Sequence, residues 1–408
     1  MNVLIVGKMF SGLEKYLLEH GHRCLVLGDV KTLKESEKDA QKWTLCDFSN
    51  RKTILESVSS LPEIPDAIMA TYENYILPMA YIGEALGLRT IPVAAAKACT
   101  DKQLMREAFS KSPRTISPDF ENAMAWENVE RFANTHVFPL IIKPANLSKS
   151  LLVTKASNME ELKDNWGKTI GRIDIIYKKY APDREPKLIV EEFLEGSVHS
   201  VDAFVDARGQ VSIVDGIVDY KTGYDVGYDD NFHYSRIIPS RIIGEKKKEF
   251  MECAELGCKA LGMKSSAAHI EIIMTKKGPR IVEIGARSGG YRERMYRLAY
   301  GIDITGNTLA LALDEALDIK PRKREPVAVL ELFPKIAGKF VGIKNEKALK
   351  GLASLKYLSI KASPGDYIGK SSEGYKMTAV IVLHNKDLAQ FKRDLDYVDN
   401  EVRIETIG

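Results

Sequence analysis

The sequence predicts a multidomain protein that combines an α/β unit with α+β regions. Its 408 residues are enough for two to four hydrophobic cores. The first ninety or so residues alternate short apolar runs, each ended by glycine, with helical patterns, and this β-α-β rhythm favours a parallel sheet covered by helices. A basic, proline-bounded segment, Pro321–Pro326, precedes a final stretch of mixed strands and helices. We therefore divide the chain into residues 1–93, 94–320 and 321–408, with a subdomain at about 114–190.

Strands are predicted where short apolar, β-branched runs are bounded by turn residues, and helices where apolar residues recur every three or four positions. In the first unit, Gly21 and Gly87 close the two helices. The predicted strands are 2–6, 23–27, 66–70, 138–143, 151–154, 187–193, 199–206, 210–220, 232–238, 327–333, 355–360, 378–383 and 402–406. The predicted helices are 10–20, 74–86, 94–110, 121–135, 158–170, 244–261 and 304–316, with two more near Glu346 and Asp387.

The composition limits the kinds of molecule that this protein is expected to bind. Charged residues make up 28% of the chain and hydrophobic residues 45%, as in ordinary globular proteins. The net charge of +3 is too small to indicate nucleic acid or an anionic membrane. No apolar run approaches the roughly 20 residues of a membrane span, and the N-terminus does not read as a signal peptide. The five cysteines are scattered and are expected to be free thiols in the cytoplasm. We expect small-molecule partners, and the sequence is compatible with a homodimer.

The glycines at the start of the chain do not form a known nucleotide loop. A P-loop needs Lys-Ser/Thr after its second glycine, but Leu13-Glu14 follow Gly12. The dinucleotide fingerprint needs a glycine where Met9 stands, which disfavours an NAD-linked dehydrogenase. We interpret this segment as a tight strand-to-helix turn. Glu73, just beyond a strand, is placed to reach a ligand at the carboxyl edge of the sheet, but as a lone acid it is expected to be a charge at a helix N-terminus.

Two acidic residues mark a predicted hairpin over residues 269–290. Glu271 and Glu283 lie on successive alternating runs, and a turn centred on Lys277 places them opposite each other. Like charges at that spacing are unfavourable, so we expect a hard divalent cation held by both carboxylates and by substrate phosphates. Without the cation, their repulsion is expected to raise one of the two pKa values. Even steps along the strand bring Arg287 to the same face.

Four segments in order carry a family resemblance. They are Asp101-Lys102, FPLIIKPANLSKSLLV, LIVEEFLEGSVHSVDAF and HIEIIMTKKGPRIVEIGARSGG. Together, over roughly Ala94 to Ala316, they resemble the ATP-grasp superfamily of carboxylate–amine ligases, closest in layout to L-amino-acid ligases. The resemblance implies an ATP-grasp fold over residues 94–320, a Rossmann-like pre-ATP-grasp domain before it and a small α+β domain after it, with a lid at about 114–190.

The resemblance also implies roles for individual residues. Two lysines would hold the ATP phosphates, and two loop hydroxyls would join them. A hinge would contact adenine through its backbone, and an arginine would lie near the reacting carboxyl group. Two glutamates would bind Mg²⁺, with Mn²⁺ as a substitute. These residues are Lys102 and Lys143 for the phosphates, Ser148 and Ser150 in the loop, Glu191, Glu192, Phe193 and Leu194 in the hinge, Arg287 for catalysis, Glu271 and Glu283 for the metal, and Ser288, Gly289, Gly290 and Lys221 for the substrate.

Three departures from the family pattern bear on these roles. Gly285 offers no side-chain oxygen where the usual ExNPR motif has asparagine, so one ligand of a second metal is missing. Val198 stands near the place of an acid that binds ribose, and the phosphate loop carries Leu147 where glycine is frequent.

As a whole, the resemblance predicts an enzyme that uses ATP to activate a carboxylate as an acyl phosphate and joins it to an amine. The alternatives are a carboxylase-type or purine-pathway ligase, or a non-catalytic nucleotide-binding protein.

Overall fold

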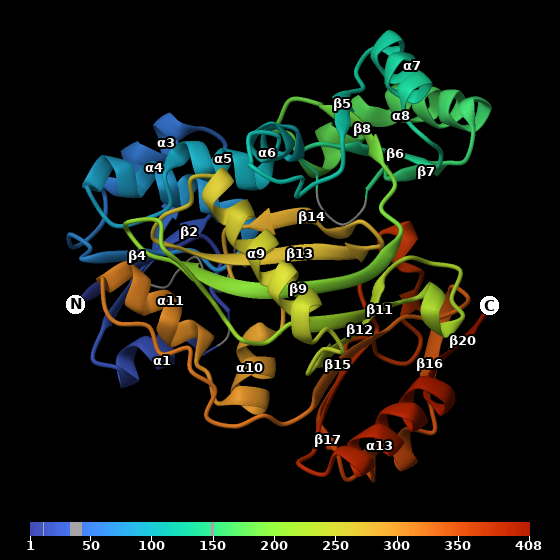
Figure 1. Ribbon diagram of the computed structural model, residues 1–408. Helices are drawn as coiled ribbons and strands as arrows, with labels where there is room; N and C mark the ends of the chain where they lie inside the picture. Colours follow the sequence, from blue (N-terminus) through green and yellow to red (C-terminus); the bar gives the residue numbers. More distant parts are fainter. Residues whose placement is uncertain (11, 33–42, 148–150) are drawn as a thin grey trace.

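The structure is a computed structural model that describes residues 1–10, 12–32, 43–147 and 151–408 (Figure 1). It has the predicted mixture of α/β and α+β parts. An N-terminal unit and a lid lie on one side of a large central sheet, and the C-terminal part lies at the opposite end of that sheet (Figure 1).

The N-terminal unit is a parallel sheet of four strands in the order β3-β2-β1-β4. One face packs on helices of this unit, and the other on a core that includes Leu13, Leu17 and Leu309. Because Leu309 belongs to a later helix, α11, the unit is joined to the central domain by a shared core. The elements are β1 (Asn2–Val6), α1 (Leu13–Glu19), β2 (Arg23–Asp29), β3 (Trp43–Cys46), α3 (Arg51–Val58), β4 (Ala67–Met69), η1 (Glu73–Tyr75) and α4 (Ile76–Leu86).

The helix predicted over 94–110 is two helices, α5 (Val93–Thr100) and α6 (Lys102–Phe109). The break lies at Asp101, whose backbone is extended and whose carboxylate accepts hydrogen bonds from the N–H groups of Gln103 and Leu104, at 3.0 and 3.3 Å. Asp101 is therefore an N-cap, a position where aspartate is strongly favoured. The cap directs Lys102, the first residue of α6, toward the lid, where its backbone N–H donates to the Ala145 carbonyl at 2.7 Å.

The lid is a four-stranded sheet in the order β5-β8-β6-β7, covered by two helices that share one core (Figure 1). The first helix is shorter than predicted, because residues before it pair as a strand, and the second is longer. The elements are β5 (Phe120–Asn122), α7 (Trp126–Thr135), β6 (Leu140–Pro144), β7 (Thr154–Ala156), α8 (Met159–Tyr180) and β8 (Leu188–Glu192).

The central sheet runs β14-β13-β9-β11-β12-β15-β19-β17, with β10 paired to β9. Helix α9 packs against one face, and α10 and α11 lie on the other (Figure 1). The single strand predicted over 210–220 is two strands, because the chain leaves the sheet between Ile213 and Val218. The elements are β9 (Gly196–Val205), β10 (Val211–Ile213), β11 (Val218–Thr222), η2 (Tyr224–Val226), β12 (His233–Ile238), α9 (Gly244–Ala260), β13 (Ser266–Thr275), β14 (Gly278–Gly285), α10 (Arg292–Tyr300) and α11 (Ile304–Leu313).

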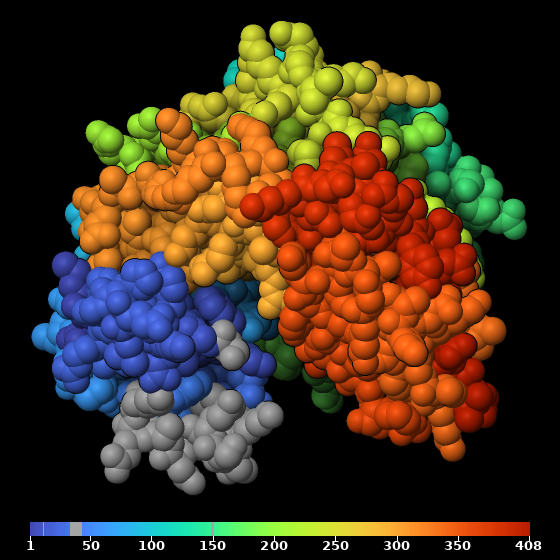
Figure 2. All heavy atoms as spheres, turned by 90° about the horizontal axis from the view of Figure 1, so that it is seen from below, coloured from blue at the N-terminus to red at the C-terminus, as the bar shows by residue number. Residues whose placement is uncertain are grey.

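The sheet continues across the boundary that we drew at residue 320. Strands β15, β19 and β17 of the C-terminal part extend it beyond β12, and a separate sheet, β18-β16-β20, packs with α13 on one of its faces. Seen from below, the surface is hollowed between the N-terminal unit and the C-terminal part (Figure 2). The elements are β15 (Val327–Leu332), β16 (Gly338–Lys344), α12 (Glu346–Lys350), β17 (Leu355–Ile360), β18 (Tyr367–Ile368), η3 (Ser371–Glu373), β19 (Ala379–His384), α13 (Leu388–Glu401) and β20 (Arg403–Ile407).

In the described ranges, no helix combines the length and the apolar character that crossing a membrane requires.

Candidate active site

The two glutamates of the hairpin face each other, as predicted, but the turn is not the predicted one. Thr275 pairs with Gly278, so the turn is two residues long and is centred between Lys276 and Lys277. That register alone would place Glu271 opposite Val282. A β-bulge between Glu271 and Ile272 shifts the pairing by one residue and brings Glu271 opposite Glu283.

Each glutamate has a cationic neighbour. The Lys102 Nζ atom lies 3.1 Å from a carboxylate oxygen of Glu283, and the His269 Nε2 atom lies 3.4 Å from one of Glu271. The charge of Lys102 holds the pKa of Glu283 below its ordinary value. Burial works to raise the pKa of Glu271, but the hydrogen bond and the charge of His269 outweigh it and lower that pKa. The expectation that repulsion raises one of the two pKa values is therefore wrong, because protein cations already neutralise the pair.

These carboxylates fit a magnesium ion that is shared with a phosphate substrate. Within the part of the chain that the structure describes, no three or more His, Cys, Asp or Glu side chains come together as a metal cage. Mg²⁺ seldom uses such cages, and it is commonly bound by one or two carboxylates together with substrate phosphates and water. Glu271 and Glu283 supply that minimal set.

A buried trio of charges lies beside this pair. Glu191 forms ion pairs with Lys143 and with the Nε atom of Arg106, the latter at 3.2 Å. Burial lowers the pKa of Lys143 to about 8, although the charge of Glu191 opposes that shift. Burial works to raise the pKa of Glu191, but the charges of Lys143 and Arg106 hold it below its ordinary value. Arg106, which was not among the predicted site residues, is buried and also donates to the carbonyl of the bulged residue Val282 at 2.8 Å.

The predicted hinge follows β8 and links the lid to the central sheet. The Glu192 carboxylate accepts a hydrogen bond from the Asp119 N–H at 3.0 Å, and the Phe193 N–H donates to the Pro139 carbonyl at 3.3 Å. The Lys155 ammonium lies 4.0 Å from the centre of the Phe193 ring. The N–H of Phe193 is thus already engaged, and Leu194 is the next hinge residue that can offer its backbone to an adenine edge.

The predicted phosphate loop is anchored where it begins. Tyr177 donates to the side chain of Asn146, and an Arg184 Nη1 group donates to the Asn146 carbonyl at 2.5 Å. Lys102 reaches the next carbonyl, that of Leu147, at 3.4 Å. The predicted hydroxyl donors, Ser148 and Ser150, lie outside the described residues.

Arg287 lies at the end of the hairpin and pairs with a residue of the N-terminal unit. Its Nε atom lies 2.8 Å from the Glu73 carboxylate, and its Nη1 group donates to the Ser288 carbonyl at 3.0 Å. Glu73 also fills the space beside Gly285, where an added Cβ atom would lie 3.0 Å from its Oε2 atom. Burial raises the pKa of Glu73, although the charge of Arg287 opposes this. Glu73 is therefore a site residue, and not simply the helix-end charge that we expected.

The glycine segment, residues 288–290, follows Arg287 and is hydrogen-bonded to a buried acid, Asp202. The Gly289 N–H donates to Asp202 at 2.7 Å, and a Cβ atom at Gly289 would lie 2.4 Å from the His269 ring. Arg292 is fully buried, and its Nε group also donates to Asp202, at 3.1 Å. Asp202 and Glu271 together raise the pKa of His269 to about 10, against the effect of burial. One network thus connects the glycine segment to Glu271. Gly290 follows in an open position.

Lys221 is the one predicted substrate residue that the structure places elsewhere. Its neighbour Tyr220 bonds Arg292 at 2.6 Å, on the face of the sheet that carries the site. Side chains alternate along a strand, so Lys221 points to the opposite face. There its ammonium group lies 2.7 Å from Asp399 of α13. Lys221 therefore lies apart from the other predicted substrate residues, and it joins the central sheet to the C-terminal part.

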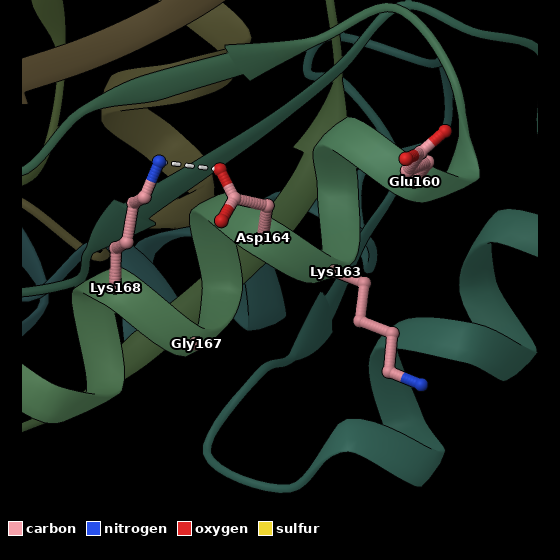
Figure 3. A pocket seen from close by; sticks show the side chains of 5 residues that line it. All are labelled: Glu160, Lys163, Asp164, Gly167 and Lys168. Atoms are coloured by element: carbon pink, nitrogen blue, oxygen red, sulfur yellow. Dashed lines mark hydrogen bonds and ion pairs between the residues drawn. The ribbon is translucent and has the colours of Figure 1, made fainter.

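Two hollows differ in character. One is shallow and lies on the exposed side of α8, where Lys168 pairs with Asp164 one helical turn away (Figure 3). The other is a cavity of about 500 Å³ between the N-terminal unit, the glycine segment and α11. Its wall includes Glu73, Arg287 and Gly289, so it opens directly onto the candidate site.

Comparison with known proteins agrees with this geometry. Residues 136–293 match the ATP-grasp domain family. The alanine–anticapsin ligase of Bacillus subtilis (strain 168) is 29% identical over 265 residues, which cover 62% of this chain and 55% of that protein. The chain thus spans about half the length of the curated relatives that it matches first.

Solved structures extend the likeness to the whole chain. The L-amino acid ligase of Bacillus licheniformis has a TM-score of 0.78 at 17% identity, covering 100% of this chain and 99% of that one. The phosphoribosylglycinamide synthetase of Anaerococcus prevotii has a TM-score of 0.72 at 19% identity, with the same coverage. Complexes with ADP occur among the solved structures of this fold. The chain therefore has the ATP-grasp fold, and its residues 136–293 match the ATP-grasp domain family.

Proposed function

We propose that this protein is an ATP-dependent ligase that activates a carboxylate as an acyl phosphate and joins it to an amine, forming an amino acid amide or a dipeptide. One observation carries the proposal. Glu271 on β13 faces Glu283 on β14, Lys102 pairs with Glu283, and β14 ends two residues before Arg287 at the mouth of the cavity. The groups that can bind ATP phosphates, directly or through a metal ion, therefore lie next to an arginine that can bind a carboxylate. The relative named as an alanine–anticapsin ligase supports the same chemistry.

In the first step, an oxygen of the substrate carboxylate attacks the γ-phosphorus of ATP. The bond from that phosphorus to the β-phosphate oxygen breaks, and ADP leaves. Lys102 and Lys143 neutralise the phosphates, because phosphoryl transfer depends on positioning and charge compensation. Glu271 and Glu283 would hold Mg²⁺, with Mn²⁺ as a substitute, and the bound metal would neutralise phosphate charge. Arg287 orients the carboxylate with its planar fork.

In the second step, the amine nitrogen attacks the carbonyl carbon of the acyl phosphate. The carbon–oxygen bond to phosphate breaks, phosphate leaves, and the nitrogen gives up a proton to solvent. Arg287 and the backbone of the glycine segment lie where negative charge develops on the carbonyl oxygen. The Asp202 network holds that segment in place and limits the reorganisation that the step requires.

Isotope transfer tests the mechanism. With an ¹⁸O-labelled carboxylate and a productive amine, one labelled oxygen should appear in the released phosphate. Phosphate release screened across amino acids, singly and in pairs, identifies the substrates. Turnover in which all of the label stays with the carboxyl product would exclude the acyl-phosphate route.

A purine-pathway ligase is the second candidate, because the phosphoribosylglycinamide synthetase has the same fold along the whole chain. Ile68, Met69 and Met79 in the cavity wall favour an amino acid over a phosphorylated ribose. Bicarbonate, formate and phosphoribosylamine in the same screen would separate the two candidates.

Compartment and assembly are also proposed. Cys46, Cys99, Cys253 and Cys258 are free thiols, and we propose the reducing cytoplasm as the compartment, where thiols persist. A homodimer is the assembly to test first, by light scattering.

A further inference from the structure

The cavity beside Arg287 has two chemically different ends. Its apolar end is formed by β4 and the residue after it, by α4 and by α11, and it includes Met69, Met79, Leu311 and Ala312. Its volume of about 500 Å³ lies within the usual range for a small-molecule site, about 300–1,000 Å³. The lining residues belong to two units of the chain, so the cavity exists only where the N-terminal unit meets the central domain. This is the kind of place where ligand sites concentrate.

The polar end carries one negative and one positive charge side by side. The Arg287 Nε atom and the Glu73 carboxylate are 2.8 Å apart, and about three tenths of each side chain is exposed. An α-amino acid carries the complementary pair, a carboxylate and an ammonium group separated by one carbon atom. Its carboxylate can take the place of Glu73 on Arg287, and its ammonium group can then pair with the released Glu73 carboxylate.

We propose that this cavity binds the acid substrate, and that this substrate is an α-amino acid with a large uncharged side chain. Glu73 pairs with the α-ammonium group, Arg287 with the α-carboxylate, and the side chain extends toward Met69, Met79 and Leu311. This inference rests on the ligase function proposed above and adds the class of acid. A carboxylic acid without the ammonium group would leave Glu73 unpaired, and an acidic side chain would meet both Glu73 and an apolar wall.

Because Gly285 has no side chain, it leaves space for the Glu73 carboxylate at the mouth of the cavity. A Cβ atom there would lie 3.0 Å from the Glu73 carboxylate, closer than most such contacts. A larger side chain, such as asparagine, would therefore push Glu73 away from the mouth of the cavity. The glycine that departs from the family motif and the acid from the N-terminal unit thus act as one specificity feature.

The test uses hydroxylamine in place of the unidentified amine. Hydroxylamine nitrogen attacks the acyl phosphate carbon, phosphate leaves, and a coloured hydroxamate–iron complex reports which acids are activated. The full-length protein with magnesium and ATP is offered leucine, methionine, alanine, glutamate and 2-hydroxy-4-methylpentanoate. Leucine and methionine should exceed alanine in kcat/KM by at least about 10–200-fold, because an apolar pocket discriminates by that amount for a single methylene group and both side chains are larger than alanine by more than one. The hydroxy acid should be at least about 100-fold poorer than leucine, because a site built for a polar group rejects analogues that lack it.

Glu73→Gln keeps the shape of the side chain and removes its charge. The preference for leucine over the hydroxy acid should fall by about tenfold or more in this variant. Glu63→Gln is the matched control, since Glu63 also belongs to the N-terminal unit and pairs with an arginine, Arg23, at 2.6 Å, but does not line the cavity. The preference should be unchanged in the control. A ratio of two substrates is insensitive to partial unfolding, which lowers both rates equally.

Three outcomes would overturn the inference. One is a preference for alanine or glutamate, the second is equal use of leucine and the hydroxy acid, and the third is an unchanged ratio in Glu73→Gln. In each case hydroxamate still forms, so the ligase function would stand. No hydroxamate with any acid, while ATP still binds, would instead overturn the ligase function and this inference with it.

Discussion

Replacing Glu191 by glutamine is expected to destabilise the protein by about 3 kcal/mol. Removing one partner of a buried ion pair typically costs about 3–5 kcal/mol, because the other charge stays buried without compensation. Here two cations, Lys143 and Arg106, lose that partner, and at most 8% of any of the three side chains is exposed. Lys143 can relieve part of the cost by losing its proton, since its pKa is already only about 8. Arg106 cannot, so we expect the lower end of the range.

Thermal unfolding measures this cost. At roughly 2–4 °C per kcal/mol for a domain of 150–250 residues, the melting temperature should fall by about 6–12 °C. Glu121→Gln is the matched control, because Glu121 lies on the neighbouring strand β5 and pairs with Arg131 at 3.0 Å, with 36% and 62% of the two side chains exposed. A solvated pair of that kind contributes at most about 1 kcal/mol. Equal melting temperatures for the two variants would refute the assignment of the buried trio.

Four further predictions concern ligand binding and turnover. Lys143→Ala should weaken ATP binding more than AMP binding in calorimetry, and equal losses would indicate the adenine pocket instead. In the wild type, ATP affinity should be full below pH 8 and should decline as pH rises through the Lys143 pKa of about 8, because the neutral amine does not attract phosphate; a flat profile from pH 7 to 9.5 would contradict this. Magnesium with ATP should raise the melting temperature of the wild type much more than that of the Glu271→Gln, Glu283→Gln double variant, and equal stabilisation would exclude these carboxylates as the metal site. Arg287→Ala should lower kcat by about 10²–10³-fold with little change in ATP affinity. Arg287→Lys should recover only part of the lost kcat, because lysine lacks the planar guanidinium group. Full activity in the alanine variant would show that Arg287 has a structural role only.

The protonation of Lys143 also links pH to stability, and its sign is opposite to that of ATP binding. The folded-state pKa is about 8, whereas the ordinary pKa of a lysine is 10.5, so the unfolded chain binds more protons between these values. The free energy of unfolding should therefore rise with pH between these two pKa values, and this rise should be absent in Lys143→Met. Urea unfolding of the two proteins at pH 7.5 and 9.5 measures the difference.

Local pattern predicted the parts of the fold in which neighbours in sequence are neighbours in space. The alternation around Glu271 and Glu283 was enough to pair them, although the bulge that achieves the pairing has no signal in the residue pattern. The helix break at Asp101 was missed, because helical propensity continues on both sides of Asp101, whose backbone is extended. The position of Asp101 before Lys102 is a signal that could have found it, since aspartate favours N-caps.

Long-range ion pairs could not be predicted in the same way. Arg106 and Arg292 look like ordinary charges on helix surfaces, and their burial depends on acids 85 and 90 residues away. Glu73 and Arg287 come from different units, so their contact follows from how α11 packs on the first sheet. For Lys221, counting side-chain alternation from Tyr220 would have placed the lysine on the opposite face, once Tyr220 was known to face the site.

The continuous central sheet has a consequence for how this protein can be divided. The proline-bounded segment at Pro321–Pro326 resembles a place where the chain could be cut, but β15 begins directly after it and pairs with β12 over four residues. A chain that stopped at residue 320 would leave the β12 edge unpaired, and such edges recruit strands from other molecules. The C-terminal part thus covers the edge of the central sheet in addition to forming a sheet of its own. A shorter chain that stays soluble would need charged residues or proline on the exposed edge of β12.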